Sequence, residues 1–333
     1  MATMSDVARL AGVSVSTVSH VVNGTRRVPD GTRTKVLAAM RALNFEQTPH
    51  RRSLSSGVFP TIGLVMSTPS NPYWSALVSA IDSAIAKAGL NLLIVDSRDE
   101  PSSEARAVAN LLAHHVEGLI VAPTTAWDAE TSTLLREHPR PYVVVDRSCS
   151  LPVDQVTVDN VAAASRAVGH LLDLGHRRVA LIGGARNVVT SLERQRGYVD
   201  AHLRRDVEID AELVTNGEST VDGAARAATR LLALKRPPTA VFVANNSMTI
   251  GAMRAMRDAG LRVPTDVALT CFDDHPWTSL FSPRLTTIAQ PNDLIGAASV
   301  NLLLRRLKDG SAPPRHIKLE TTFVHGESCG CAR

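Results

Sequence analysis

Apolar residues near the start of the chain recur at helical spacing and predict a pair of short helices. Val7, Leu10 and Ala11 form one apolar face, and Gly12 permits a tight turn after it. A second helical pattern follows from Val15 to Val22. Two short helices joined by a glycine-containing turn form a helix-turn-helix unit, whose second helix lies in the major groove of DNA. The pattern therefore favours a DNA-reading head, although many short helix pairs bind nothing.

Polar residues at the helix starts agree with this prediction. Thr3 and Asp6 have the spacing of a capping box, and Ser14 can cap the second helix. Three valines of the second helix are expected to face the core: Val18, Val21 and Val22. The side chains left to face base edges and phosphates are Val15, Ser16, Ser19 and His20.

Residues 25–46 predict a third helix. Pro29 and Asp30 are start signals, and Asn44 is an expected helix end. The apolar positions at helical spacing between them are Val36, Leu37, Met40 and Leu43. Eight of the 36 Lys and Arg residues, but only three of the 32 acidic residues, lie in the first 60 positions. The head therefore carries a formal charge of +5 and the remainder −1, as expected of a unit that contacts phosphates, although charge runs are often only solvated faces.

Residues 47–60 connect the head to the rest of the chain. Thr48 and Pro49 can start a short helix that Gly57 ends. A helix of about two turns is unstable alone in water and needs a partner surface, such as a second subunit on DNA. Leu54 has nothing local to bury it, so insertion between base steps in the minor groove is a reasonable role. The alternative is an ordinary flexible linker.

After Pro60, apolar β-type runs alternate with helical patterns. In the first series the apolar β-type runs are TIGLVM, LNLLIV, GLIVA and YVVVD, and the helical patterns between them lie at 73–88, 102–114 and 128–136. In the second series the apolar β-type runs are QVTV, RVALIGG, TAVFVAN and DVALTCFD, and the helical patterns between them lie at 160–174, 190–205, 220–233 and 247–259. A tail follows, with a helical pattern at 291–307 and the run IKLETTFV. The predicted fold is an all-α helix-turn-helix head plus an α/β body of two doubly wound parallel-sheet lobes.

Polar and aromatic residues gather where these strands end. Asp146 and Arg147 follow VVV, Asn245 ends FVAN, and Asp273 ends TCFD. Such side chains offer paired hydrogen bonds to sugar hydroxyls, and an aromatic ring can stack on the sugar face. Ligands bind doubly wound sheets beyond the carboxyl ends of the strands, which predicts one cleft between the lobes. A turn or a helix cap is the other common role for Asp or Asn here, and we expect Asn246 to be a cap.

Other motifs are weaker. IGGAR at 182–186 lacks the dinucleotide fingerprint and the phosphate-loop Gly-Lys-Ser/Thr, so it predicts a tight turn and no cofactor. Cys329 and Cys331 form a CxC, but no His or Cys cluster completes a four-ligand metal set, so no metal is expected. Cys149 and Cys271 lie beside apolar runs and are expected to be buried. No order of catalytic residues favours an enzyme.

Bulk properties favour an intracellular protein. At 333 residues with 44% hydrophobic content, the chain can form two or three domains. Four cysteines do not suggest a secreted disulfide framework. The start MATMSDVARL has no basic-then-apolar leader and no apolar run approaches 18 residues, so we expect a cytoplasmic chain with no membrane partner. The nearest alternative is a stand-alone sugar-binding protein of the same body fold.

The segment DVARLAGVSVSTVSHVVNG, then VPDGTRTKVLAAMRALNF, RRSL and TIGLVM, resembles the LacI/GalR family of bacterial transcription regulators. The resemblance extends through VANNSMTIGAMRAM, CFDD and SPRLTTIAQP. It implies base contacts from the second helix and a hinge helix whose Leu54 enters the minor groove. The residues expected to contact DNA are Thr3, Ser5, Val15, Ser16, Thr17, Ser19, His20, Asn23, Arg33, Arg51 and Leu54. Where the family usually has Pro-Asn, this chain has QTPHR at 47–51, so its hinge helix is expected to start later.

The resemblance also implies lobes of the periplasmic-binding-protein type, effector contacts and a domain plan. The expected effector-binding residues are Tyr73, Trp74, Asp146, Arg147, Arg194, Asn245 and Asp273. The predicted domains are a DNA-binding domain at 1–46, a hinge helix and linker at 47–60, and an effector-binding body at 61–333. Within the body, the N-lobe is predicted at about 61–158 and 291–320, and the C-lobe at about 159–290 and 321–330.

The function implied is effector-gated repression. Two chains are expected to pair through their bodies and to place two recognition helices on a near-palindromic double-stranded DNA operator. A small molecule in the cleft, expected to be a sugar, shifts the lobes and thereby the hinges. Tetrameric relatives carry an extra leucine-repeat helix at the end, whereas this sequence stops at ESCGCAR, which favours a homodimer.

Overall fold

The computed structural model describes residues 4–23, 26, 28–43, 60–67, 71–124 and 129–331. The chain divides into two compact units, Met1–Phe59 and Pro60–Arg333. The predicted hinge helix, with Thr48, Arg51 and Leu54, lies outside the described residues.

The first unit contains the predicted helices. They are α1 (Met4–Ala11), α2 (Val15–Asn23) and α3 (Asp30–Ala42). Between α1 and α2, Gly12 has a φ of 65°, in the left-handed region that glycine adopts without steric cost. The turn is closed by the backbone amide of Val13, which donates to the carbonyl of Ala8 at 3.0 Å. The all-α helix-turn-helix head is confirmed.

The core of the head is small and differs in two positions from the prediction. Its fully buried members are Val7, Ala8, Val18, Val36 and Ala39. Leu10 and Leu37 were expected in this core but are 56% and 37% exposed. The core face of α1 is formed by Met4, Val7, Ala8 and Ala11, and at about 100° per residue Leu10 lies about 60° beyond Val7, towards solvent. The prediction that valines of α2 face the core is confirmed for Val18, which is buried, and for Val21, which is partly buried against the same core.

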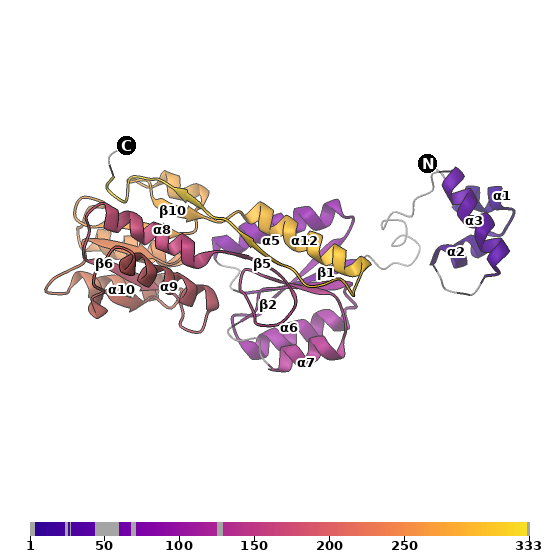
Figure 1. The fold of residues 1–333 in the computed structure, drawn as a ribbon, viewed down its shortest axis with the longest axis horizontal. Coiled ribbons are helices and arrows are strands. Elements are labelled where there is room, and N and C mark those ends of the chain that lie inside the picture. Colours follow the sequence, from indigo (N-terminus) through magenta and orange to yellow (C-terminus); the bar gives the residue numbers. More distant parts are fainter. Residues whose placement is uncertain are drawn as a thin grey trace. The chain divides into compact units, whose positions relative to one another are not determined.

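The N-lobe of the second unit is a six-stranded parallel sheet with helices on both faces. Its strands are β1 (Thr61–Met66), β2 (Asn91–Asp96), β3 (Gly118–Val121), β4 (Tyr142–Val145), β5 (Asp154–Val158) and β11 (His316–Leu319), in the order β11-β5-β4-β3-β1-β2. Its helices are α5 (Pro72–Lys87), α6 (Pro101–Ala113), α7 (Ala129–Glu137) and α12 (Asn292–Lys308). Helices α5 and α12 pair on one face and α6 and α7 on the other (Figure 1).

The C-lobe repeats this architecture. Its strands are β6 (Val179–Gly183), β7 (Val214–Asn216), β8 (Ala240–Val243), β9 (Ala268–Phe272), β10 (Thr286–Ala289) and β12 (Thr322–Val324), in the order β12-β10-β9-β8-β6-β7. Its helices are α8 (Asn160–Asp173), α9 (Val189–Leu203), α10 (Val221–Leu232) and α11 (Asn246–Asp258), with short 3₁₀ turns η1 (Ala211–Leu213) and η2 (Pro276–Leu280). Helices α8 and α9 pair, as do α10 and α11.

The chain passes between the lobes three times: after β5, between β10 and α12, and between β11 and β12. The segment QVTV opens the second series of the pattern, yet it lies inside the predicted N-lobe of 61–158, and β5 does pair with β4 in the first sheet. One strand pair departs from the predicted parallel arrangement: β12 runs antiparallel to β10. A short return strand that enters at the sheet edge without a crossover helix can pair in this way.

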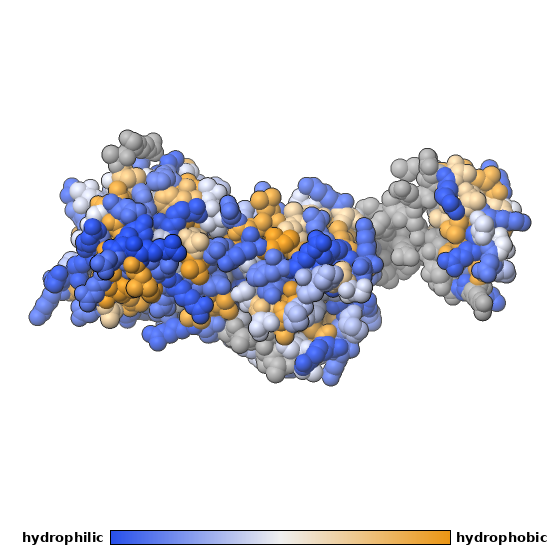
Figure 2. All heavy atoms as spheres, viewed as in Figure 1, coloured by the Kyte–Doolittle hydropathy of each residue, from blue (hydrophilic) through white to orange (hydrophobic). Residues whose placement is uncertain are grey.

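Each lobe has its own hydrophobic core, which explains why the parallel strands are apolar along their length. Strands β3, β8 and β9 are buried at every position. On the face shown in Figure 2, hydrophilic side chains cover most of the body and hydrophobic residues appear between them in smaller groups. In the part of the chain that the structure describes, no helix combines the length and apolarity needed to cross a membrane.

Candidate functional site

The second helix of the head is held by a local cap. The hydroxyl of Ser14 accepts a hydrogen bond from the backbone amide of Thr17 at 3.2 Å, which confirms the predicted N-cap of α2. The same hydroxyl lies 2.8 Å from the hydroxyls of Ser16 and Thr17. These bonds fix the first turn of α2, which is the turn that meets base edges in helix-turn-helix proteins. Asp6, expected in a capping box, forms an ion pair with Arg9 at 2.6 Å.

Most of the residues predicted to contact DNA are accessible on the head. Val15 is 46% exposed although it is apolar, and Ser5, Ser16 and Arg33 are also exposed. On α2, the side chains of Thr17, Ser19 and His20 are half-buried. The predicted residues whose side chains lie outside the described part of the chain are Thr3, Asn23, Arg51 and Leu54. An exposed valine at the start of a recognition helix is chemically suited to contact a thymine methyl group.

A second site lies in the body, at the carboxyl ends of the strands. It is a cavity with about 570 Å³ of space, part of it open to solvent, and both lobes line it. All seven residues predicted to bind the effector line this one cavity: Tyr73, Trp74, Asp146, Arg147, Arg194, Asn245 and Asp273. Strand ends that are separated by as many as 127 positions in sequence therefore meet at one place, as expected for paired doubly wound lobes.

On the N-lobe wall, a buried tyrosine and a buried aspartate are hydrogen-bonded. The hydroxyl of Tyr73, in the first turn of α5, donates to Asp146 Oδ1 at 2.7 Å. Burial raises the pKa of Asp146, although Arg147 and the Tyr73 hydroxyl both act to lower it. Burial also raises the pKa of Tyr73 well above its ordinary value, and the Asp146 carboxylate adds to this effect. Tyr73 is therefore a fixed donor, and Asp146 keeps its second oxygen for other partners.

Arg147 is fixed against the same wall. Its guanidinium donates to both carboxylate oxygens of Asp99, to the Pro123 carbonyl at 3.0 Å and to the Ser67 hydroxyl at 3.1 Å. Burial alone would lower the pKa of Arg147, but the Asp99 carboxylate raises it above its usual value. Arg147 Nε is buried without a hydrogen bond among the described residues and lies 3.7 Å from Asp146 Oδ2. This N–H is consequently available to a small polar ligand.

On the C-lobe wall, Arg194 occupies the corresponding place. Its Nε donates to Asn160 Oδ1 at 2.9 Å and its Nη1 donates to the Ala244 carbonyl at 2.7 Å. The guanidinium carbon lies 3.6 Å from the ring centroid of Phe272, so the cation stacks on an aromatic face. With only 7% of the residue exposed, Arg194 is held rigidly and directs its remaining N–H groups into the cavity region.

The two strand-end aspartates have matching backbone conformations. Asp146 follows β4 with a φ of 68°, and Asp273 follows β9 with a φ of 73°. Non-glycine residues seldom adopt this left-handed conformation, and such strain concentrates at binding sites. Asp273 Oδ1 accepts from Gln290 Nε2 at 2.7 Å, and Gln290 lies in the segment that connects β10 to α12. The C-lobe wall is thereby bonded to an interlobe connection.

The helix cap predicted at Asn246 belongs to its neighbour Asn245. Asn245 is the N-cap of α11, because its side-chain oxygen accepts from the Met248 amide at 2.8 Å. Asn246, expected to be the cap, instead lies 2.6 Å from His275 through its side-chain nitrogen. The physical reason is that strand β8 ends one residue earlier than the asparagine pair suggests, so Asn245 occupies the capping position. Asn245 nevertheless lines the cavity.

The aromatic residues differ from expectation in their exposure. Trp74 and Tyr73 are only 4% and 5% exposed, because they pack in the N-lobe core. Neither ring presents an open face for stacking, and the two rings contact each other edge to face at 5.2 Å. Sequence reasoning also missed cavity residues that come from loops and from the first turn of α9: Asn71, Asp99, Thr190, Ser191, Ser219 and Gln290. Asn71, which caps α5, had a sequence signal in its position before Pro72.

Comparison with known proteins identifies both units. Residues 3–47 match the model of bacterial regulatory proteins of the lacI family, and residues 168–329 match a periplasmic binding protein-like domain. The chain is 32% identical over 328 residues to the HTH-type transcriptional repressor PurR of Mannheimia succiniciproducens, covering 98% of this chain and 97% of that repressor. The chain belongs to the LacI family. It is a DNA-binding transcription regulator.

Other relatives and solved structures give the same result. The ribose operon repressor of Escherichia coli K12 is 32% identical over 320 residues, which are 96% of this chain and 97% of that repressor. A Lac repressor dimer bound to operator and the anti-inducer ONPF superposes with a TM-score of 0.76 at 30% identity, over 98% of this chain and 99% of that chain. The complex of the transcriptional regulator CelR with cellobiose has a TM-score of 0.75 at 30% identity, over 98% and 100%. The predicted two-lobed body of the LacI family is thereby confirmed.

The sequence suggested that the CxC near the end of the chain stands alone, but the fold places two histidines beside it. The fold brings His170 and His325 next to Cys331, so that one ligand atom of each lies within 4.8 Å of the others. The thiols of Cys329 and Cys331 are 3.0 Å apart. Of the other cysteines, Cys271 is buried as expected, whereas Cys149 is only half-buried. Sequence spacing could not reveal this cluster because its members come from positions 170 and 325–331.

Proposed function

We propose that this regulator is a repressor whose operator binding is controlled by a small polyhydroxylated ligand, a sugar, bound in the cavity between the lobes. The observation that carries the proposal is the composition of that cavity. Buried cations and carboxylates from both lobes face one space, and each is already fixed by protein hydrogen bonds. Preorganised charged groups of this kind bind hydroxyl groups without a further ordering cost.

The cavity has room for a small ligand only, because even its total empty space of about 570 Å³ includes a part that is open to solvent. The solved complex of the regulator CelR holds cellobiose, a disaccharide, which supports a sugar ligand here. The residues proposed to contact it are Tyr73, Trp74, Asp146, Arg147, Arg194, Asn245 and Asp273.

Control of DNA binding requires that the ligand favour one arrangement of the lobes. Each lobe supplies one wall, and three chain passages connect the lobes. A ligand that bridges Asp146 and Asp273 gains contacts only when the walls approach, so it binds that arrangement better and shifts the population towards it. The segment containing Gln290, which bonds to Asp273, is the connection that would respond first.

A homodimer is the proposed binding form, acting in the cytoplasm on a near-palindromic operator. The Lac repressor structure that superposes on this chain is a dimer on its operator, which supports the same arrangement. Two-fold symmetry would place the two recognition helices one helical turn of DNA apart, about 34–36 Å. Arg33 and the exposed face of α2 would then contact phosphates and bases, and Leu54 would insert into the minor groove.

The test is a DNA-binding titration with the full chain and the promoter region of its own gene. A regulator binds with an affinity that falls steeply with salt, because phosphate contacts release counterions. A stand-alone sugar-binding protein or an enzyme would show no such affinity, and an enzyme would also alter the ligand chemically. A thermal-shift screen of sugars, polyols and nucleobases identifies the ligand class, since a ligand that binds only the folded state raises the unfolding midpoint.

A further inference from the structure

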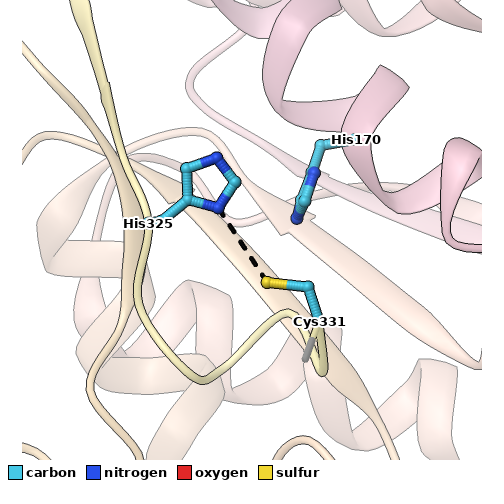
Figure 3. Close-up of side chains that lie close together, drawn as sticks. All are labelled: His170, His325 and Cys331. Atoms are coloured by element: carbon cyan, nitrogen blue, oxygen red, sulfur yellow. Dashed lines mark hydrogen bonds between the residues drawn. The ribbon is translucent and has the colours of Figure 1, made fainter. Parts of the chain in front are cut away.

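A cluster of imidazoles and thiols lies on the C-lobe, built from three segments that are distant in sequence. His170 is in the last turn of α8, His325 directly follows β12, and Cys331 lies at the end of the described chain. Figure 3 shows the two imidazoles and the Cys331 thiol converging on one another, with the thiol 3.9 Å from His325 Nδ1. The thiol of Cys329 lies 3.0 Å from that of Cys331 and adds a fourth donor atom.

We propose that His170, His325, Cys329 and Cys331 form a binding site for one zinc-class transition metal ion. Two thiolates and two imidazoles are a donor set that zinc binds with tetrahedral geometry. With two thiolates and two neutral imidazoles, the charge of a divalent ion is balanced exactly by its ligands, so no buried charge is left uncompensated.

The segment that carries the cysteines is held in place before any ion binds. The Ser328 carbonyl accepts from the Leu269 amide at 2.7 Å, and the Ser328 hydroxyl donates to the Leu269 carbonyl at 2.7 Å. The same hydroxyl accepts from the Thr286 amide at 2.8 Å. At Gly326 an added Cβ would lie 2.2 Å from the Leu285 carbonyl oxygen, so only glycine permits this close approach. The loop between His325 and Cys331 is therefore a preorganised scaffold.

His170 lies beside the Cys329 thiol. Its Nε2 is buried, and its imidazole is within side-chain hydrogen-bonding reach of Cys329. The ring is oriented by edge-to-face contacts with Phe323 at 5.2 Å and His325 at 5.0 Å between centroids. Cys329 therefore belongs to the same group of donors, and an ion bound among the four side chains would replace a weak thiol hydrogen bond by metal–ligand bonds.

The donor separations are close to those of a tetrahedral site. Zn–S and Zn–N bonds of about 2.3 and about 2.0–2.1 Å place neighbouring donor atoms about 3.3–3.8 Å apart. The donor atoms of His170, His325 and Cys331 lie within 4.8 Å of one another, which is up to about 1.5 Å wider, and the two thiols at 3.0 Å are up to about 0.8 Å closer. His325 is exposed and Cys331 is half-buried, so both side chains have room to rotate into place.

The consequence of binding is a link between the C-terminal segment and α8. The first residue of α8, Asn160, bonds to Arg194 on the cavity wall, and His170 lies near the other end of the same helix. Ten residues of helix separate the two by about 15 Å. The ion therefore stabilises the helix that supports the cavity without taking part in effector contacts, and this site is independent of the proposed effector.

The experiment is a cobalt titration of the purified full chain, freed of metal by chelation and kept reduced with a phosphine. We expect one Co²⁺ per chain, with the ligand-field bands of tetrahedral cobalt and thiolate-to-cobalt charge transfer, and displacement of Co²⁺ by Zn²⁺. Cys331→Ser and His325→Ala, at residues that are not fully buried, are expected to weaken binding at least tenfold. Cys149→Ser and His114→Ala change a thiol and an imidazole elsewhere and should leave the titration unchanged.

Three results would overturn the proposal: no tetrahedral cobalt spectrum in the reduced protein, equal binding in Cys331→Ser and His325→Ala, or equal loss in the Cys149→Ser control. If the two thiols form a disulfide on air oxidation while the reduced protein takes up no cobalt, the pair is a redox couple and the metal site is rejected. Circular dichroism of each variant establishes that a loss of binding is not a loss of fold.

Discussion

Replacing Tyr73 by phenylalanine removes one hydroxyl from the cavity wall and little else. That hydroxyl donates to Asp146 Oδ1 at 2.7 Å, and both residues are more than 90% buried. A hydrogen bond to a charged group contributes about 1.5–3 kcal/mol, so we expect Tyr73→Phe to lower the free energy of unfolding by about 2 kcal/mol. For a body of this size, that corresponds to a fall of about 4–8 °C in the unfolding midpoint.

The loss is expected to depend on pH in a defined direction. Burial raises the pKa of folded Asp146, and the Tyr73 hydroxyl lowers it, so the variant raises it further. A carboxyl group whose pKa is raised in the folded state stabilises that state at pH values below its unfolded pKa of about 3.9. This stabilisation is lost as the pH rises through the folded pKa. The difference between variant and parent should therefore be largest near neutral pH and shrink towards about pH 4.

Tyr198→Phe is the matched control. Tyr198 is fully buried and donates at 2.8 Å to the uncharged Val179 carbonyl, so its loss should cost about 1 kcal/mol with little dependence on pH in this range. Thermal unfolding monitored by circular dichroism from about pH 4 to about pH 7 compares the two variants. If both lose the same stability at every pH, Asp146 is not an ionised acceptor and the description of this wall is refuted.

Four further predictions concern the head, the hinge and the cavity. Ser14→Ala removes the cap of α2 and should destabilise the head by about 1 kcal/mol, measured as earlier melting of its helices, and an unchanged melt would contradict the cap. Arg33→Ala should reduce the slope of log affinity against log salt by about 1, whereas Arg230→Ala, exposed on the body, should not change it. Leu54→Ala should weaken specific operator binding far more than non-specific binding in a gel-shift comparison, and equal losses would reject the wedge. Asp273→Ala should abolish the effector response and leave DNA binding intact, whereas loss of both would indicate a role in folding.

The fold could be predicted from sequence where the hydrophobic pattern is unambiguous. Buried parallel strands such as TIGLVM, together with helical repeats between them, specify both lobes and their crossovers. The alternation alone does not say which sheet a strand joins: QVTV opens the second series of the pattern, but β5 pairs with β4 in the N-lobe, because its partner strand is decided by tertiary contacts. The exposure of Leu10 could not be seen either, since the two turns of α1 have too few apolar positions to define the core face.

The cavity could be predicted in part for a related reason. Residues directly at strand ends, such as Asp146 and Asp273, are placed by topology alone. Loop residues such as Asp99 and Gln290 reach the cavity through contacts that no local pattern encodes. The clustering of His170 with Cys331 depends on the antiparallel return of β12, which the sequence did not indicate.

The most direct test of the central claim is fluorescence anisotropy of the full chain on labelled promoter DNA at low salt, with and without the ligand that emerges from the thermal-shift screen. The account predicts salt-sensitive binding whose affinity changes when the ligand is added, and whose change disappears in Arg194→Ala. Absence of binding to the promoter under any of these conditions, or binding that every candidate ligand leaves unchanged, would contradict effector-controlled regulation.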